Sequence, residues 1–273
     1  AAHISEGDQD KVCLVFDLGG GTLDVSLVER FENVVSVTAV SGDNRLGGTD
    51  FDAAIARAFC REAGIDFDAL SRQRQELLVR QAESCKIALT TREPVLMVVE
   101  HEGAMASLEL TNEWMISSCA GLFQRMAAPA KRVFLDAEMS MDELDELVMV
   151  GGSSHMPAVR QYISRLLGRK PAEDSRPDTA IALGAGICAG MKSRAADLRE
   201  LVLTDVCPFT LGVAVLNTAD PERPIMSSLI ERNCVLPSSR EDVFSTAYEG
   251  QEEVMIEVYQ GENLYCRDNT FLG

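Results

Sequence analysis

Two aspartates with a run of glycines between them are the residues of this chain best suited to hold a large anion. Asp17 ends an apolar run, and Gly19, Gly20 and Gly21 lead on to Thr22 and Asp24. Glycine has no Cβ, so its backbone N–H groups can approach a ligand closely. Consecutive amides in such a turn form a concavity that suits phosphate. The carboxylate of Asp17 could hold the water shell of Mg²⁺ beside it, and Thr22 adds a hydroxyl to the same space.

The elements that must position this turn are two strands. Leu14 to Phe16 run into Asp17, and Val25 to Val28 follow Asp24 in near-alternation, which predicts a strand, a tight turn and a second strand. A hairpin turn with a glycine bulge would give the same glycines. The two aspartates spaced seven apart favour the phosphate interpretation. A third strand is predicted over Val34 to Val40.

A second glycine turn, Gly47-Gly48, precedes a predicted helix with Thr49 or Asp50 as its N-cap. Phe51, Ile55, Ala58 and Phe59 give that helix one apolar stripe. The amides at its start could face a phosphate. A loop that simply begins a helix explains the turn equally well.

The helix predicted over residues 71–90 carries a polar column beside its apolar face of Leu78, Ala82, Cys85 and Leu89. Glu83, Lys86 and Thr90 recur at i, i+3 and i+7, so they share one side of the helix. A carboxylate, an ammonium and a hydroxyl in one column could grip a ribose and the edge of a base. A solvated helix face with one weak ion pair is the alternative.

A third turn follows a predicted buried strand, Leu147 to Val150. Gly151, Gly152 and Ser153 come next, and Pro157 stands near the first turn of a helix, which is typical of a nucleotide-type turn. His155 would point out of this turn and lie against a base, although a lone histidine is more often a capping or surface residue. Arg176-Pro177-Asp178 opens a further helix whose small residues suit either a planar ligand or a tight helix–helix contact.

Between the second and third turns, residues 95–109 predict a hairpin turning at Glu102-Gly103. Thr111 then caps a predicted helix that is interrupted before Pro129 and continues to Leu135.

Length, charge and cysteine content limit the kinds of function that the chain can have. The 273 residues suggest about two domains at ~150 residues each. A net charge of −18 from 25 basic and 43 acidic residues repels nucleic acid and anionic membranes, so neither is an expected partner. Eight cysteines occur with no zinc or redox spacing, which indicates a reduced, cytoplasmic setting. No signal peptide and no membrane-spanning apolar run is present in the sequence.

Taken in order, the turns closely resemble those of the heat-shock protein 70 chaperones. The matching stretches are Asp17–Thr22, Leu46–Asp52, Val150–Ser153, Pro177–Ala185, Leu201–Pro208, Val243–Ala247 and Tyr259–Glu262. They cover nearly the whole chain. The Leu-Thr-Asp-Val-Cys-Pro variant at residues 203–208 looks most like the divergent HscC-type branch rather than the main DnaK type.

This resemblance implies ATP hydrolysis coupled to the holding of unfolded peptides, with ATP or ADP and Mg²⁺ as ligands. Gly20, Gly21 and Thr22 would line the β- and γ-phosphates, and Asp17 would place magnesium, through water, and the attacking water. Asp17 and Thr22 are therefore the expected catalytic residues. The expected ATP-binding set, which includes the adenosine-contacting column and the adenosine turn, is Gly19, Gly20, Gly21, Thr22, Glu83, Lys86, Thr90, Gly151, Gly152, Ser153, His155 and Asp178. At the position of His155 the family usually has an arginine stacked on the adenine.

The resemblance also divides the chain. Residues 1–200 would be lobe II of an actin-like ATPase, an α/β fold with a mixed five-stranded sheet, flanking helices and a helical subdomain inserted at about 48–137. Residues 201–208 would be the interdomain linker, which in the family docks on the ATPase domain in one nucleotide state. The alternative for this apolar run is an ordinary edge strand.

Residues 209–273 would begin the all-β sandwich that binds peptide, with strands at 210–216, 227–231, 242–247 and 253–260. Their groove positions would be Val213, Leu216, Phe244, Ala247, Val254 and Ile256, for which plain sandwich core is the alternative. The implied partners are unfolded client peptides, a J-domain co-chaperone and a nucleotide exchange factor.

Lobe I of the family's ATPase has no counterpart before Asp17, and the sequence stops within the sandwich, before a lid. We therefore expect a truncated chaperone that is inactive as an ATPase on its own. Two other classes share some of these features. A different actin-fold phosphotransferase, such as a sugar kinase, has similar glycine turns, but the apolar linker and β-rich tail argue against it. A non-catalytic binding module would not need Asp17, Thr22 or the polar column.

Overall fold

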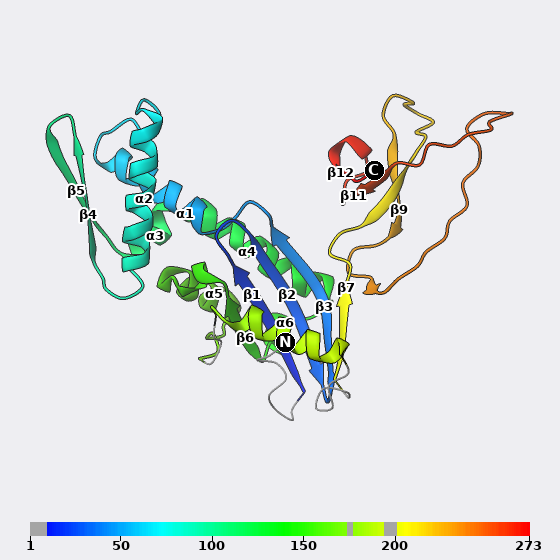
Figure 1. The fold of residues 1–273 in the computed structure, drawn as a ribbon, viewed down its shortest axis with the longest axis horizontal. Helices are drawn as coiled ribbons and strands as arrows, with labels where there is room; N and C mark the ends of the chain where they lie inside the picture. Colours follow the sequence, from blue (N-terminus) through cyan, green and yellow to red (C-terminus); the bar gives the residue numbers. More distant parts are fainter. Residues whose placement is uncertain (1–9, 174–176, 194–200) are drawn as a thin grey trace.

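The computed structural model describes residues 10–173, 177–193 and 201–273, and a mixed six-stranded sheet lies at its centre (Figure 1). The strand order is β10-β7-β3-β2-β1-β6. β1 pairs antiparallel with β2 and parallel with β6, and β3 pairs parallel with β7. The bounds are β1 Lys11–Leu18, β2 Leu23–Phe31, β3 Val34–Asp43, β6 Glu146–Val150, β7 Val202–Val206 and β10 Val235–Leu236.

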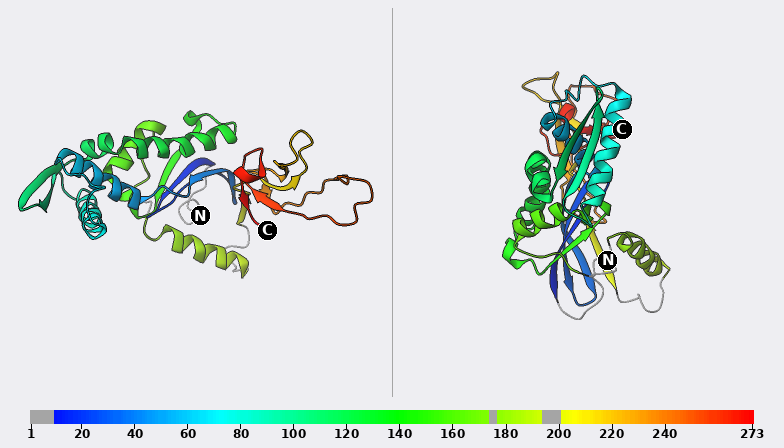
Figure 2. Two further views of the ribbon diagram at one scale, coloured as in Figure 1. Left: turned by 90° about the horizontal axis from the view of Figure 1, so that it is seen from above. Right: turned by 90° about the vertical axis from the view of Figure 1, so that its left-hand side faces the viewer.

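The predicted strand–turn–strand is confirmed, with β1 and β2 in register from Lys11 opposite Arg30 to Leu18 opposite Leu23. Leu14, Phe16 and Leu18 alternate on one face of β1 and are fully buried. α5 (Pro157–Leu167) and α4 (Ala120–Asp136) lie on one side of the sheet, and α6 (Ala180–Lys192) lies on the other (Figure 2).

The chain between β3 and β6 holds α1 (Gly48–Glu62), α2 (Arg72–Ala88), β4 (Val95–His101), β5 (Ala104–Leu110), α3 (Asn112–Ser118) and α4. The predicted hairpin is confirmed as β4–β5, and Glu102 and Gly103 turn it with positive φ angles of 51° and 84°. Thr111 caps α3 as expected, through its side chain and the N–H of Trp114. The predicted interruption is present, but it lies ten residues before Pro129 rather than next to it. The helix breaks at Cys119, and α4 continues through Pro129.

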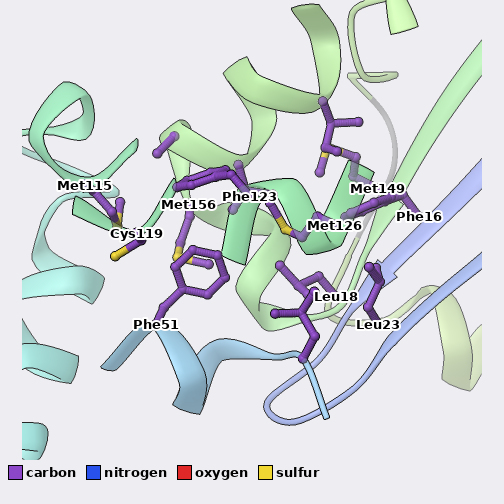
Figure 3. Close-up of a cluster of buried hydrophobic side chains, with 14 of the residues drawn as sticks. Phe16, Leu18, Leu23, Phe51, Met115, Cys119, Phe123, Met126, Met149 and Met156 are labelled. Atoms are coloured by element: carbon purple, nitrogen blue, oxygen red, sulfur yellow. The ribbon is translucent and has the colours of Figure 1, made fainter. Parts of the chain in front are cut away.

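One core holds the sheet to these helices, and methionine and phenylalanine fill much of it (Figure 3). Phe51 of α1 meets Phe123 of α4 edge-on at 5.4 Å between ring centroids. Met126 and Met149 close the gap towards Phe16 of β1. Unbranched methionine fills irregular space, so it suits a junction between elements of different direction.

The sheet differs from the five strands expected. Four strands come from residues 11–150, and Pro171 adds only an isolated bridge beside β6. The other two, β7 and β10, come from the expected linker and tail. β7 pairs with β3 on one edge and with β10 on the other, so it is not an edge strand.

The tail forms a second sheet, ordered β12-β11-β8-β9. Its strands are β8 Leu211–Val215, β9 Ile225–Ile230, β11 Val258–Gln260 and β12 Thr270–Phe271. The strand expected at 242–247 and most of that at 253–260 are wrong, because residues 237–256 run as an extended excursion outside both sheets (Figure 1). Apolar alternation does not make a strand without a neighbour to pair with, and this excursion has none among the described residues.

Short 3₁₀ helices lie at Met141–Glu143, Gly152–His155 and Cys266–Asp268. Arg176 and residues 194–200, which belong to the predicted last helix start and the approach to the linker, lie outside the described residues.

Candidate functional site

The three glycine turns of the sequence meet at one edge of the sheet. The N–H groups of Gly48 and Thr49 donate to the carbonyls of Gly19 and Gly20, at 3.0 and 2.8 Å. The hydroxyl of Ser153 donates to the Gly19 carbonyl at 2.8 Å. The second and third turns thus hold the first by its carbonyl oxygens.

The approach of these turns needs glycine at two positions. A Cβ on Gly47 would lie 2.3 Å from the nitrogen of Gly21, and the obstacle is backbone that cannot rotate away. Gly151 has φ of 84°, and a Cβ there would lie 2.4 Å from the Leu18 carbonyl oxygen and 2.6 Å from a carboxylate oxygen of Asp17. Asp17 therefore lies directly against the third turn.

In the first turn the N–H of Gly19 donates to the Thr22 carbonyl at 3.0 Å, but the next two amides lack such a partner among the described residues. Gly20 and Gly21 are exposed, and their N–H groups donate to no described residue. A Cβ on either would meet nothing within 4 Å. Two unpaired amides in an open glycine turn form a concavity for an anion. The turn is thus shaped from outside by its neighbours and open towards solvent.

The second turn begins α1, whose N-cap is Gly47 rather than the expected Thr49 or Asp50. The Asp50 carboxylate accepts from the Gly47 N–H at 2.8 Å, and the Thr49 hydroxyl donates to the Gly20 carbonyl at 2.9 Å. The Asp50 side chain thus satisfies a backbone group at the helix start from inside the helix, and the Thr49 side chain ties the helix to the first turn.

The predicted polar column of α2 lies beside these turns. Lys86 is 8% exposed, and its ammonium is 2.7 Å from a carboxylate oxygen of Asp52 and donates to the Gly48 carbonyl at 3.0 Å. Glu83 is exposed on the same side of α2, and Thr90, which was expected inside the helix, is exposed just beyond its end at Ala88. An ammonium has three donors, so one N–H of Lys86 is free for a ligand.

A cavity of about 300 Å³ joins the turns to the column. Six of the expected ATP-binding residues line it: Gly20, Glu83, Lys86, Thr90, Gly152 and Ser153. The rest of its lining is Gly48, Thr49, Asp52, Ile87 and Met156. Asp52 was missed, although a carboxylate between Phe51 and Ile55 on the apolar stripe of α1 was a signal that it needed a buried partner.

The other predicted residues lie around this cavity or away from it. Gly19, Gly21 and Thr22 belong to the first turn without lining the cavity. His155 and Asp178 also lie outside its lining, and they face each other at 3.1 Å between Nε2 and a carboxylate oxygen. The imidazole is held by a carboxylate here, rather than standing free to stack on a base.

Two carboxylates face each other across the end of the β1–β2 pair. Asp17 and Asp24 are partners in the register, so their side chains share one face of the sheet. Burial, and then the charge of Asp24, raise the pKa of Asp17. Burial also raises the pKa of Asp52, against the pull of Lys86. Like charges at a strand end are unfavourable unless a cation joins them, which fits Mg²⁺ at this point.

A second hollow lies in the tail, with a volume of about 950 Å³. All six residues expected in a peptide groove line it: Val213, Leu216, Phe244, Ala247, Val254 and Ile256. Phe244, Val254 and Ile256 are 48%, 68% and 69% exposed. These three side chains are therefore largely exposed to solvent in the tail.

No helix among the described residues is long and apolar enough to cross a membrane. The same residues contain no group of three or more histidine, cysteine or acidic side chains placed to bind a metal directly.

Fold and site define a mixed α/β protein with three glycine turns converging beside a polar helix, followed by a small β sheet. The sequence profile of the family described as Hsp70 protein matches residues 1–273, and the chain belongs to that family. It is 37% identical over 282 residues to the stromal 70 kDa heat shock-related protein, chloroplastic, of Pisum sativum, covering 100% of this chain and 39% of that protein.

Bacterial and plant relatives agree. Identity is 38% over 285 residues to chaperone protein DnaK of Trichormus variabilis, covering 100% of this chain and 40% of the relative. It is 37% over 282 residues to heat shock 70 kDa protein 7, chloroplastic, of Arabidopsis thaliana, again with 100% of this chain and 38% of the relative. The chain thus spans about 40% of the length of these relatives.

Proposed function

We propose that this chain carries ATPase lobe II, the interdomain linker and the first part of the peptide-binding sandwich of an Hsp70 chaperone. The boundaries are 1–200, with an insert at about 48–137, then 201–208 and 209–273. ATP binding and hydrolysis would be coupled to binding and release of unfolded peptides, assisted by a J-domain co-chaperone and a nucleotide exchange factor. The Leu-Thr-Asp-Val-Cys-Pro stretch supports the HscC-type branch, and we propose a cytoplasmic setting.

The observation that carries the nucleotide part is the single cavity that joins the glycine turns to the polar column. The free amides of Gly20 and Gly21 would hold phosphate, together with the remaining donor of Lys86. Glu83 and Thr90 present an acceptor and a hydroxyl to the hydroxyls of a ribose. Gly152 and Ser153 close the side towards the base. His155 would reach the ligand only by leaving Asp178.

Mg²⁺ would be held, through water, at the strand end occupied by Asp17, with Asp24 opposite. When bound, the ion supplies positive charge to the phosphates. The chain's own part is to fix that carboxylate by packing it beneath Gly151, and to keep the Thr22 hydroxyl beside the amides. The cavity is open, with Glu83 and Thr90 exposed, so we expect the 273-residue chain alone to hydrolyse ATP no faster than buffer containing magnesium.

The test is calorimetric titration of the chain with ADP and Mg²⁺, in the parent form and with Thr90→Val. Among the described residues the Thr90 hydroxyl donates only to the Ile87 carbonyl at the end of α2, so it is the least structural part of the column. We expect weak binding that Thr90→Val weakens by roughly tenfold, about the free energy of one hydrogen bond. Equal affinity in both proteins, with unchanged thermal stability, would show that the column does not hold the nucleoside.

Peptide binding is tested separately. The expected ligand is an extended apolar peptide in the hollow that Phe244 and Ile256 line. Phe244→Ser should reduce binding of a fluorescent unfolded peptide, whereas Tyr248→Ser, an exposed change outside the hollow, should not. Loss of binding in both variants would mean that the excursion binds peptide through nonspecific hydrophobic contacts and not through the hollow.

A further inference from the structure

Cys207 and Cys234 are 27 residues apart in the sequence, and the fold places them opposite each other. Cys207 directly follows β7, and Cys234 directly precedes β10. The antiparallel register pairs Val206 with Val235, so the cysteines are the next pair along the ladder. The Cys207 N–H donates to the Cys234 carbonyl at 2.9 Å.

The turn that carries Cys234 is anchored on both sides. Asn233 has φ of 62°, and its N–H donates to the Cys207 carbonyl at 2.7 Å. Its side-chain oxygen accepts from the N–H of Val40 in β3 at 3.2 Å. Arg232 pairs with Asp136 at the end of α4. The approach of the two cysteines is thus held by three separate elements and does not depend on a mobile loop.

Opposite residues in an antiparallel pair have Cβ atoms about 4.5–5.5 Å apart, and a disulfide needs about 3.5–4.5 Å. A movement on the order of 1 Å therefore suffices to join the sulfurs. At present the Cys207 thiol donates to the Phe209 carbonyl at 3.1 Å, and the Ser238 hydroxyl lies 3.3 Å from the Cys234 sulfur. These two hydrogen bonds are weak, so each sulfur can give up its partner and turn towards the other.

The surroundings of Cys234 differ from those of most other cysteines, whereas Cys207 is buried as they are. Burial raises the pKa of Cys13 to about 11 and that of Cys119 to about 12, and it also raises those of Cys60 and Cys85. Cys234, by contrast, is partly exposed and has a guanidinium nitrogen of Arg240 3.7 Å from its sulfur. Thiols that react with oxidants are accessible and lie beside a positive charge.

We propose that Cys207 and Cys234 form a redox-sensitive pair, which a peroxide converts into an intramolecular disulfide between the end of β7 and the start of β10. The Cys234 sulfur attacks one peroxide oxygen, giving a sulfenic acid while the other oxygen leaves as water or an alcohol. The Cys207 sulfur then attacks the sulfenic sulfur and expels water. Two thiols lose two electrons and two protons in all, and the peroxide takes them up. A dithiol reverses the reaction by exchange.

The bond would close the ring of residues 207–234, which contains β8 and β9. The tail could then no longer separate β10 from β7. This proposal needs neither nucleotide nor peptide binding and stands apart from the function proposed above.

The test is to oxidise the folded 273-residue chain with a small excess of hydrogen peroxide and map its cystines by mass spectrometry without reduction. We expect one linked pair of peptides, containing Cys207 and Cys234, with the loss of two hydrogen masses and full reversal by dithiothreitol. Cys188→Ser, at the exposed cysteine of α6, is the matched control and should change nothing. Cys207→Ser should leave a sulfenic acid on Cys234 that dimedone traps.

Three results would overturn the proposal. One is a cystine that involves Cys188 in place of this pair. Another is linkage between molecules only. The third is an equal yield of the same pair when the chain is oxidised in denaturant, because the fold would then contribute nothing. The parent chain supplies all three measurements, so a variant that fails to fold does not weaken the test.

Discussion

Gly47→Ala should disrupt the meeting of the turns, and the built geometry gives the size of the effect. The new methyl would lie 2.3 Å from the Gly21 nitrogen, 2.4 Å from the Gly21 Cα and 2.5 Å from the Gly20 carbon, where contact begins near 3.4 Å. These are backbone atoms, so the first turn must move as a whole. The φ angle of Gly47, −161°, is one that alanine also adopts, so the cost of the substitution comes from packing alone.

Overpacking of this kind costs about 1–3 kcal/mol. Displacing the turn also strains the hydrogen bonds from Gly48 and Thr49 to its carbonyls, at about 1 kcal/mol each. We expect a loss of about 3 kcal/mol, which lowers the Tm by roughly 6–12 °C. Chemical and thermal denaturation followed by circular dichroism measure it.

Gly20→Ala is the matched control, because a Cβ there meets nothing within 4 Å and its φ is not in the left-handed region. Its stability should stay within about 0.5 kcal/mol of the parent or rise slightly. Its affinity for phosphate-bearing ligands should fall, because the methyl covers a free amide. Equal stability of the two variants would refute the close approach of the turns.

Asp17→Asn should stabilise the chain at neutral pH. Because the pKa of Asp17 is raised, the folded state holds the proton more firmly than the unfolded state does. This carboxyl therefore favours folding at low pH, and that contribution is lost as the pH rises through its folded pKa. Denaturation at pH 4 and pH 8 should show that the free energy of unfolding of the variant exceeds that of the parent only at the higher pH. Lys86→Met should cost about 3–5 kcal/mol, because it leaves the Asp52 carboxylate buried without its partner, and adding Asp52→Asn should recover part of that loss. A double-mutant cycle by urea denaturation that gave simple additivity would contradict the pair. Arg232→Ala should loosen the tail while leaving the core intact, since its partner Asp136 is on α4; faster proteolysis after residue 200, with unchanged protection of β1, would show this, and uniform loss of protection would count against it.

How much of this could be predicted depends on how local each signal is. The β1–β2 turn, the β4–β5 hairpin and the α2 stripe follow from neighbouring residues, and all three are confirmed. The prediction of a strand at 242–247 was wrong because a strand needs a neighbouring strand to pair with, and the local sequence pattern does not show whether one is present. The predicted N-cap of α1 was wrong because the position of Gly47 is fixed by contact with Gly21, which lies 26 positions earlier in the sequence.

The candidate site divides in the same way. The spacing of Glu83, Lys86 and Thr90 predicted one helix face, but not the buried ion pair that holds Lys86 to Asp52. The His155–Asp178 contact joins the third turn to the residues just before α6, and no periodic pattern in the sequence indicates it. The opposition of Cys207 and Cys234 depends on the pairing of β7 with β10, so the spacing of the cysteines in the sequence could not reveal it.

The pairing of β7 also sets how firmly this strand is held to the central sheet. It meets β3 through three residue pairs, Val34 to Ser36 against Val202 to Thr204, and β10 through two. β1 has eight pairs with β2 and five with β6. Force that pulls β7 away from the central sheet would therefore separate it from β3 before it sheared β1 from its neighbours. The parallel seam with β3 is therefore a place where a small energy input detaches β7 while the core between the central sheet and its helices stays intact.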